Sequence, residues 1–318
     1  MSRQNPTVII ALGGNAISPK NETGNIEEQF AHTRESLDAV MHFVRERYNI
    51  CITHGNGPQV GAELFKNEIT KEQIPSLPLG MLVANTQGAI GYMIQQTLQN
   101  ALQKDNIDRE VVTFISQVKV DGNDPAIKSP TKFVGKTYKK EEADKLSELY
   151  NWSMKKQENQ IWRRVVSSPK PLYIFNGKSV KHLVEFGTIV IAGGGGGIPA
   201  FEDSNNILHG LDAVIDKDMS AALLGRVIRA EELFIITDVD QVYLNYGAGN
   251  QTKISKASVK EVKRWVDEKQ FGEGTMLPKI LAAIYFLEYY GNKVVITSLG
   301  KVEKALKGKA GTVITKEK

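Results

Sequence analysis

The sequence repeats one pattern: a short run of β-branched and apolar residues that stops abruptly at glycine or small polar residues. The examples are V-I-I-A-L-G-G-N-A at 8–16, I-C-I-T-H-G-N-G at 50–57, T-I-V-I-A-G-G-G-G-G at 188–197, L-F-I-I-T-D-V-D at 233–240 and K-V-V-I-T-S-L-G at 293–300. Runs without clean apolar-polar alternation are typical of strands that are covered on both faces. The pattern therefore predicts buried strands in a sheet with helices on each side.

Helical periodicity fills intervals between these runs. Residues 27–48 and 82–102 each place large apolar side chains on one stripe, comprising Phe30, Leu37, Val40, Met41, Val44 and Tyr48 in the first, and Ile90, Met93, Ile94, Leu98 and Leu102 in the second. Alternating strands and helices favour an α/β fold, a three-layer αβα sandwich around a central, mainly parallel, open sheet. Ligands of such sheets bind at the carboxyl ends of the strands, where these glycines fall.

Composition limits the classes of function. The chain has 318 residues and a formal net charge of +4, which is too weak and dispersed for a nucleic-acid-binding protein. Its one cysteine, Cys51, excludes an internal disulfide and suits a reducing compartment. The apolar run near the N-terminus is too short for a signal peptide, and no later segment approaches a membrane span. We expect a cytoplasmic protein with no nucleic-acid and no membrane partner.

One segment interrupts the alternation of strands and helices. Residues 121–171 are dense in Lys, Glu, Pro and Gly. We interpret them as a protruding, lid-like subdomain inserted in a single domain that spans 1–318. A solvated surface excursion without a role is the alternative, and composition does not decide between the two.

Familiar phosphate-binding motifs do not account for the glycines. G-K-T at 135–137 and G-K-S at 177–179 lack the first glycine of a P-loop, because Pro130 and Leu172 stand there. The third glycine of H-G-N-G-P-Q-V-G at 54–61 comes one place late for a dinucleotide site. His54 within it is interpreted as structural or as a hydrogen-bond donor. We expect backbone N–H groups from three strand ends to converge on anionic oxygens: Gly13-Gly14-Asn15, Gly55-Asn56-Gly57 and 193–197.

The five consecutive glycines at 193–197 admit two interpretations. A flexible linker is one, but such linkers are usually followed by polar sequence, whereas Ile198 and Pro199 close this run at once. A backbone loop that approaches a ligand is the other, and we favour it. The sequence leaves open which of the five N–H groups would donate.

Two expected helices carry charges at informative positions. In 211–224 the apolar stripe includes Leu211, and Asp218 falls on it seven residues later, so its carboxylate should point inward toward a cation such as Lys217. Lys279 follows Pro278 in the first turn of another helix, where the dipole disfavours a lysine unless an anion lies between. A helix-start or surface acid and a solvent-exposed lysine remain the alternatives. Glycine cradles, inward lysines and a buried acid together favour phosphoryl transfer.

Six motifs in the same order resemble those of the carbamate kinases, in the amino acid kinase superfamily. They are V-I-I-A-L-G-G-N-A, T-H-G-N-G-P-Q-V-G, A-I-K-S-P-T-K, G-G-G-G-I-P, A-V-I-D-K-D and M-L-P-K-I, and the resemblance runs from about residue 8 to 315. It implies the amino acid kinase fold, a homodimer with a protruding subdomain, and the reversible reaction of ATP and carbamate to ADP and carbamoyl phosphate. It also implies Mg²⁺ carried by the nucleotide and a place in arginine catabolism.

The resemblance also implies roles for individual residues. Lys128 and Lys217 would neutralise the transferring phosphoryl group, and Asp218 would orient the lysines. The phosphoryl group and carbamate would be bound by Gly13, Gly14, Asn15, Gly55, Asn56, Gly57, Gly194 and Gly195. The nucleotide would be bound by Lys279, Asp238, Tyr243, Met276, Leu277 and Pro278.

The chain departs from the family in two places, both in or beside the expected subdomain. Residues 157–164 read Q-E-N-Q-I-W-R-R, where the family has a glycine-rich run with an acid, and Phe133 replaces the usual proline. These changes put the packing of the subdomain in doubt more than the reaction. Three rival functions stay open: an amino acid kinase with another acceptor, a biosynthetic enzyme that forms carbamoyl phosphate, and a non-catalytic nucleotide-binding regulator.

Overall fold

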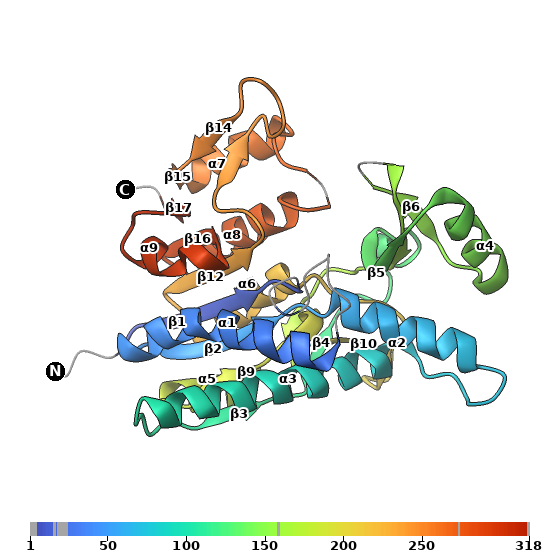
Figure 1. Cartoon of the computed structure of the whole chain (residues 1–318), viewed down its shortest axis with the longest axis horizontal. Coiled ribbons are helices and arrows are strands. Elements are labelled where there is room, and N and C mark those ends of the chain that lie inside the picture. The colour runs from blue at the N-terminus through green and yellow to red at the C-terminus, as the bar shows by residue number, and fades with distance from the viewer. Residues whose placement is uncertain (1–4, 15–16, 18–24, 158–159, 273, 317–318) are drawn as a thin grey trace.

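A central sheet organises the computed structural model, which describes residues 5–14, 17, 25–157, 160–272 and 274–316. Within these residues eight strands form the sheet in the order β15-β17-β16-β12-β1-β2-β9-β3 (Figure 1). Neighbouring strands run parallel, except β16 and β17. The bounds are β1 Thr7–Leu12, β2 Asn49–His54, β3 Val111–Thr113, β9 Ile189–Ile191, β12 Glu232–Thr237, β15 Lys256–Ser258, β16 Lys293–Ser298 and β17 Thr312–Thr315.

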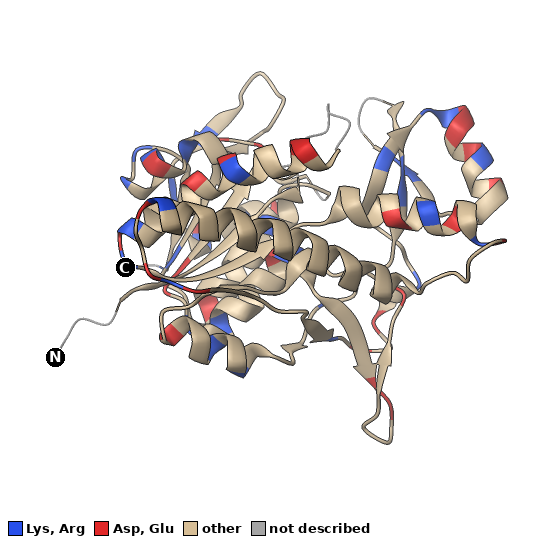
Figure 2. Cartoon of the chain, turned by 60° about the horizontal axis from the view of Figure 1, so that its bottom comes forward, with Lys and Arg blue, Asp and Glu red and all other residues tan. Residues whose placement is uncertain are grey.

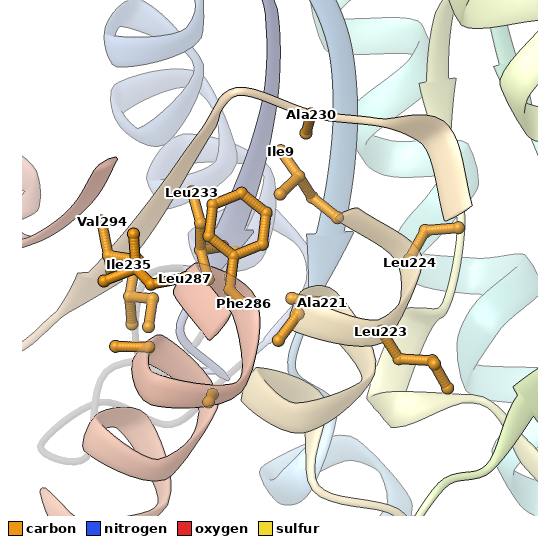
Figure 3. Close-up of a cluster of buried hydrophobic side chains, with 14 of the residues drawn as sticks. Ile9, Ala221, Leu223, Leu224, Ala230, Leu233, Ile235, Phe286, Leu287 and Val294 are labelled. Atoms are coloured by element: carbon orange, nitrogen blue, oxygen red, sulfur yellow. The ribbon is translucent and has the colours of Figure 1, made fainter. Parts of the chain in front are cut away.

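Helices cover both faces of this sheet. Alternate side chains of β1 point to opposite sides, so Ile9 packs with Leu224 and Phe286 in one core (Figure 3), while Ile10 packs with Val40 in another. The first core belongs to α5 Gly177–Glu185, α6 Lys217–Ile228 and α8 Leu277–Tyr289, and the second to α1 Ile26–Arg45, α3 Leu79–Lys104 and the short α9 Val302–Leu306. The predicted three-layer αβα sandwich is confirmed.

The two helices predicted from periodicity form with slightly different ends. The first begins at Ile26 behind a capping box, in which Asn25 and Glu28 each bond the other's backbone N–H. It ends at Arg45, so Tyr48 lies beyond it in the turn to β2. The second extends past both predicted ends, to Leu79 and Lys104. Periodicity thus located both helices and misplaced their ends by a few residues.

Smaller sheets lie beside the carboxyl ends of the central strands. One has the order β11-β10-β4-β8, with β4 Gln117–Lys119, β8 Tyr173–Ile174, β10 Ile198–Glu202 and β11 Leu208–Gly210. Another pairs β13 Val242–Leu244 with β14 Thr252–Ile254, ahead of α7 Val259–Asp267. The remaining short helices are η2 Pro125–Ile127, η4 Gly194–Gly196 and η5 Leu299–Lys301.

A separate unit projects beyond α2 Gly57–Thr70, within the predicted insertion (Figure 1). It pairs β5 Lys132–Tyr138 and β6 Met154–Lys156 with β7 Trp162–Val166, and carries α4 Lys140–Tyr150. Trp152 and Tyr138 form its core, and Phe65 of α2 packs against them. The altered stretch 157–164 includes residues 158–159, which lie outside the described residues. The boundaries 121–171 and a lid-like role stay predictions.

The projecting unit meets α2 backbone to backbone. A Cβ placed on Gly61 of α2 would collide with the backbone of Gly135 in β5. Gly135 has a φ of +71°, a conformation that favours glycine, and the β5–β7 register shifts beside it. Both glycines are therefore required where the unit attaches to the main body.

The five-glycine run is a packed turn. Its residues are buried, and Gly193, Gly195, Gly196 and Gly197 all have positive φ. Side chains of neighbouring elements fill the space where Cβ atoms would lie, such as Asn56 beside Gly195 and Val118 beside Gly197. The flexible-linker interpretation is therefore excluded by burial and packing.

We predict that Gly195→Ala destabilises the fold strongly. The residue has a φ of +64°, and the new Cβ would lie 2.5 Å from Cγ of Asn56. The free energy of unfolding, measured in urea, should fall by about 2 kcal/mol or more. Gly210→Ala is the control, because among the described atoms nothing lies within 4 Å of its new Cβ. Equal losses in the two variants would contradict the packed-turn description.

His54 lies against the glycine run at the end of β2. A Cβ on Gly194 would lie 2.6 Å from Cε1 of the His54 ring, and Nδ1 of His54 donates to the carbonyl oxygen of Gly55 at 3.1 Å. Burial is the main reason that the pKa of His54 falls to about 4. The hydrogen bond to Gly55 raises this pKa, and the positive charge of Lys217 lowers it further. His54 is therefore a neutral, packed group at pH 7, which fits a structural role.

Stability should consequently decrease as the pH falls from 7 to 5. Unfolded His54 takes up a proton near pH 6.5, whereas in the folded chain its pKa is about 4, so acid favours the unfolded state. Roughly 2 kcal/mol of the free energy of unfolding should be lost over this interval because of His54. Urea unfolding of wild type and His54→Gln at both pH values measures it. An unchanged pH dependence in the variant would show that other groups cause the loss.

Candidate functional site

The glycine-rich ends of β1 and β2 lie in direct contact. Register places Leu12 beside His54, so the residues that follow both strands leave the sheet together. A Cβ on Gly55 would lie 2.8 Å from the backbone nitrogen of Gly14, and a Cβ on Gly14 would lie 3.4 Å from Cδ of Pro58. Gly55 is therefore required for this approach, whereas a Cβ on Gly14 would make an ordinary contact. Asn15, predicted as part of the cradle, lies outside the described residues.

The backbone of the third strand end leaves two N–H groups without a partner. The carbonyl oxygens of Gly193, Gly194 and Gly196 accept from Thr53, Gln87 and Ser220, respectively. The N–H groups of Gly194 and Gly195 make no hydrogen bond within the part of the chain that the structure describes. These are the two glycines that were predicted to contact the phosphoryl group, and that assignment stays a prediction.

Other predicted cradle residues have partners in the protein. The N–H groups of Gly13 and Gly55 donate to carbonyl oxygens of Ile236 and Leu12, which extends the sheet by one step. Asn56 is 5% exposed, and its side-chain nitrogen donates to Oγ1 of Thr86 at 2.8 Å. Asn56 therefore also serves to fix α3 against the end of β2.

A buried carboxylate with two lysines lies beside these glycines. The side chain of Asp218 is 4% exposed, forms an ion pair with Lys217, and accepts from Nζ of Lys279 at 3.2 Å. The stem of Lys217 runs past Gly55, since a Cβ there would lie 3.4 Å from Cδ of the lysine. The first turns of α6 and α8 thus bring their charges to the ends of β1 and β2.

The charges in this cluster support one another. Burial raises the pKa of Asp218, but attraction to Lys217 and Lys279 outweighs it and holds the pKa below its ordinary range. Burial likewise lowers the pKa of Lys279, yet Asp218 and Asp216 raise it above its ordinary value. For Lys217, burial and the neighbouring Lys279 lower the pKa although Asp218 opposes them. Asp218 is therefore an anion at neutral pH that holds two buried ammonium groups together.

The helix that carries Asp218 is shorter than the sequence pattern indicated. We expected a continuous stripe from Leu211, but α6 begins at Lys217 with Asp216 as its N-cap. The side chain of Asp216 accepts from the N–H groups of Asp218 at 2.9 Å and Met219 at 3.2 Å. The predicted stripe from Leu211 was therefore wrong. Asp218 lies in the first turn of α6, as the helix-start alternative had it, but its carboxylate points inward, so a surface position is excluded.

Lys279 occupies the first turn of α8, as predicted. The anion that compensates its charge there is a carboxylate of the protein. Pro278 precedes it at the start of the helix, and the lysine side chain is 16% exposed. The carboxylate of Asp218 and the carbonyl oxygen of Thr275 accept from its ammonium group. The solvent-exposed alternative is therefore excluded.

The structure favours Lys132 over Lys128 as the lysine of the projecting unit. Lys128 follows η2, is exposed, and makes no side-chain hydrogen bond or ion pair within the described residues. Lys132 begins β5 and forms an ion pair with Asp216, the N-cap of α6. It also helps to lower the pKa of Asp218. Both lysines stand in A-I-K-S-P-T-K, and the only signal that distinguishes Lys132 is its place at the start of a strand.

The residues predicted for the nucleotide lie around α8 and β13. Asp238 follows β12 and contributes to the raised pKa of Lys279. Tyr243 lies on β13 with its ring centroid 5.9 Å from that of Tyr246. Met276 and Leu277 pack against the core beneath α8. Asp238 is thus close enough to act on the charged cluster, and the contact of these residues with a nucleotide stays a prediction.

Charges elsewhere on the chain are mixed in sign. Figure 2 shows Lys and Arg interspersed with Asp and Glu along the helices, including α4. In the described ranges, no helix is both long and apolar enough to cross a membrane. Among these same residues no three His, Cys, Asp or Glu side chains gather into a set that could hold a metal ion. Cys51 is buried in β2.

Known proteins match the chain over nearly its whole length. The family model described as the amino acid kinase family matches residues 6–298. The carbamate kinase of Pyrococcus horikoshii is 41% identical over 310 residues, which are 97% of this chain and 98% of that protein.

Solved structures agree with the sequence comparison. Carbamate kinase from Giardia lamblia bound to citric acid has a TM-score of 0.93 and 35% identity, covering 98% of this chain and 99% of that one. The same enzyme bound to AMP-PNP has a TM-score of 0.89 and 36% identity, covering 98% and 99%. The chain therefore belongs to the amino acid kinase family, among the carbamate kinases.

Proposed function

We propose that the chain catalyses reversible phosphoryl transfer between ATP and carbamate, with ADP and carbamoyl phosphate on the other side of the reaction. The observation that carries this proposal is the buried cluster of Lys217, Asp218 and Lys279 beside the glycines that end β1 and β2. The carbamate kinases that match the chain over nearly its full length support it.

The mechanism needs positioning and charge neutralisation more than covalent chemistry from the protein. Carbamate is already an anion, so an oxygen of carbamate attacks the γ-phosphoryl group in line without a general base, and ADP leaves. Lys217 and Lys132 neutralise charge on the transferring group, while Asp218 fixes the lysine geometry. N–H groups of Gly194 and Gly195 are suited to donate to its oxygens.

The nucleotide would occupy the side of the cluster formed by α8 and β13. Lys279 would bind its phosphates, with Asp238, Tyr243, Met276, Leu277 and Pro278 around the rest. We write Mg²⁺ as part of the nucleotide substrate, because the nearby carboxylates of Asp216 and Asp218 are already paired with lysines. When bound, the ion would neutralise phosphate charge. A Giardia relative that binds AMP-PNP supports the nucleotide site.

Two of the rival functions are less well supported, whereas a biosynthetic enzyme that forms carbamoyl phosphate would use the same residues. A non-catalytic nucleotide-binding regulator would have no use for two buried lysines on one carboxylate beside the phosphoryl cradle. An amino acid kinase with another acceptor is less well supported, because the relatives described above that match the chain over nearly its full length are carbamate kinases.

Three further properties are proposed from the resemblance. The chain would form a homodimer, act in the cytoplasm, and generate ATP in arginine catabolism. The burial of its one cysteine in β2 is compatible with a reducing compartment. Analytical ultracentrifugation measures the first property directly.

The reaction is tested by ATP formation from ADP, Mg²⁺ and carbamoyl phosphate in a coupled assay. Freshly purified wild-type protein should produce ATP at a rate proportional to enzyme concentration. The control replaces carbamoyl phosphate with inorganic phosphate, which lacks the high-energy bond and should yield no ATP. A folded preparation that makes no ATP would remove the proposed function.

Lys217→Ala should decrease kcat far more than it weakens ADP binding. Its ammonium group lies at the glycine cradle beside Asp218, where charge develops in the transition state. We expect a loss on the order of 10² to 10³ in kcat. Steady-state kinetics and calorimetric titration with ADP measure the two effects. Near-normal turnover would exclude Lys217 from catalysis.

Lys132→Ala and Lys128→Ala should have different effects, because Lys132 is paired at the N-terminus of α6 and Lys128 is exposed. Loss of Lys132 should decrease kcat by about 10²-fold, whereas loss of Lys128 should leave it within about twofold. The variants are matched controls, since both remove one lysine from the same segment. The opposite ranking would restore the role that the sequence assigned to Lys128.

A further inference from the structure

Arg163 reaches the site from the projecting unit and has no role in the mechanism described so far. It lies on β7, and its Nε donates to carbonyl oxygens of Gly135 at 2.7 Å and Val134 at 3.3 Å. These bonds leave the outer edge of the guanidinium free to turn away from β5. Because Gly135 also contacts Gly61 of α2, the arginine is fixed relative to the main body.

The guanidinium is directed at the N-terminus of α2. A Cβ placed on Gly57, the first residue of the helix, would lie 3.9 Å from Nη2 of Arg163. A cation at a helix N-terminus meets the positive end of the dipole, which is unfavourable unless an anion lies between them. Burial lowers the pKa of Arg163, but a guanidinium remains charged in proteins. Its Nη groups make no hydrogen bond within the described ranges.

Gly57 connects this arginine to the phosphoryl cradle. Its backbone nitrogen would lie 3.9 Å from a Cβ on Gly14, and Cδ of Lys217 would lie 3.4 Å from a Cβ on Gly55, the other neighbour of Gly14. Cations of two kinds therefore flank the glycines: lysines on α6 and α8, and an arginine on β7. A planar guanidinium matches the two oxygens of a planar carboxylate better than an ammonium group does.

We propose that Arg163 binds the acceptor: the carboxylate oxygens of carbamate, or the carbamoyl oxygen of carbamoyl phosphate, together with the N-terminus of α2. This inference rests on the proposed function and assigns the acceptor end of that same site. Lys217 then binds the phosphoryl group and Lys279 binds the nucleotide. Arg163 would contact neither the phosphoryl group nor the nucleotide. Arg163 is thus a specificity residue for a small, planar anion.

Steady-state kinetics of Arg163→Gln and Arg163→Lys test the proposal. The KM for carbamoyl phosphate should rise roughly 10- to 100-fold in Arg163→Gln, as expected for one lost charge-assisted contact, while the KM for ADP stays within about twofold. Arg163→Lys keeps the charge and should restore the KM for carbamoyl phosphate in part, because its single carbamoyl oxygen needs only one charged donor. It should not restore the KM for carbamate, whose two carboxylate oxygens match the fork of the guanidinium. Lys155→Gln is the matched control, since Lys155 is exposed directly opposite Arg163 on β6.

A structural role for Arg163 predicts a different result. If both KM values rise together, or if Lys155→Gln has the same effect as Arg163→Gln, the acceptor-binding role is overturned. Calorimetric titration with carbamoyl phosphate alone separates this inference from the proposed function. Wild type that makes no ATP but binds carbamoyl phosphate, with binding lost in Arg163→Gln, would overturn the function and retain the Arg163 site. If wild type makes ATP and Arg163→Gln keeps the wild-type KM for carbamoyl phosphate, the proposed function is retained and the Arg163 site is overturned.

Discussion

The carboxylate of Asp218, shared by Lys217 and Lys279, is the interaction on which the rest of the site depends. Two ammonium groups that are mostly buried would repel each other and favour deprotonation without it. With it, the first turns of two helices from different parts of the chain are joined at the carboxyl edge of the sheet. Lys132 and Asp216 add a second ion pair that joins the projecting unit to the same helix start. Charge pairing therefore positions the cations that a transferring phosphoryl group requires.

Glycines determine how closely other groups approach this cluster. Gly14 and Gly55 allow two strand ends to meet, and Gly61 and Gly135 allow the projecting unit to rest directly on α2. The run at 193–197 uses positive φ angles to turn its carbonyl oxygens toward protein donors. The N–H groups of Gly194 and Gly195 have no partner among the described residues. The site lies at the carboxyl edge of the sheet because parallel strands end at the same edge, so loops that are far apart in sequence meet there.

The sequence predicted the three layers, the glycine-rich strand ends at one edge of the sheet, and the inward direction of Asp218. Apolar periodicity and the glycines that end each apolar run depend on local structure, so both can be identified in the sequence. It misjudged where α6 begins, since the apolar residues before Lys217 are buried without being helical. It singled out Lys128, whereas the structure pairs Lys132 with Asp216, and it gave Arg163 no role in the site. These contacts depend on how the projecting unit sits on α2. Such contacts between distant segments leave no periodic signal in the chain.

We propose that Asp218 holds its lysines for phosphoryl transfer and not for folding or nucleotide binding. Rapid-quench measurement of a single turnover, with Asp218→Asn compared to wild type at saturating ADP and carbamoyl phosphate, tests it most directly. The account predicts that the rate of the chemical step falls by about 10²-fold or more while the affinity for ADP changes little. An unchanged single-turnover rate, in a folded variant whose ADP affinity has fallen, would contradict it.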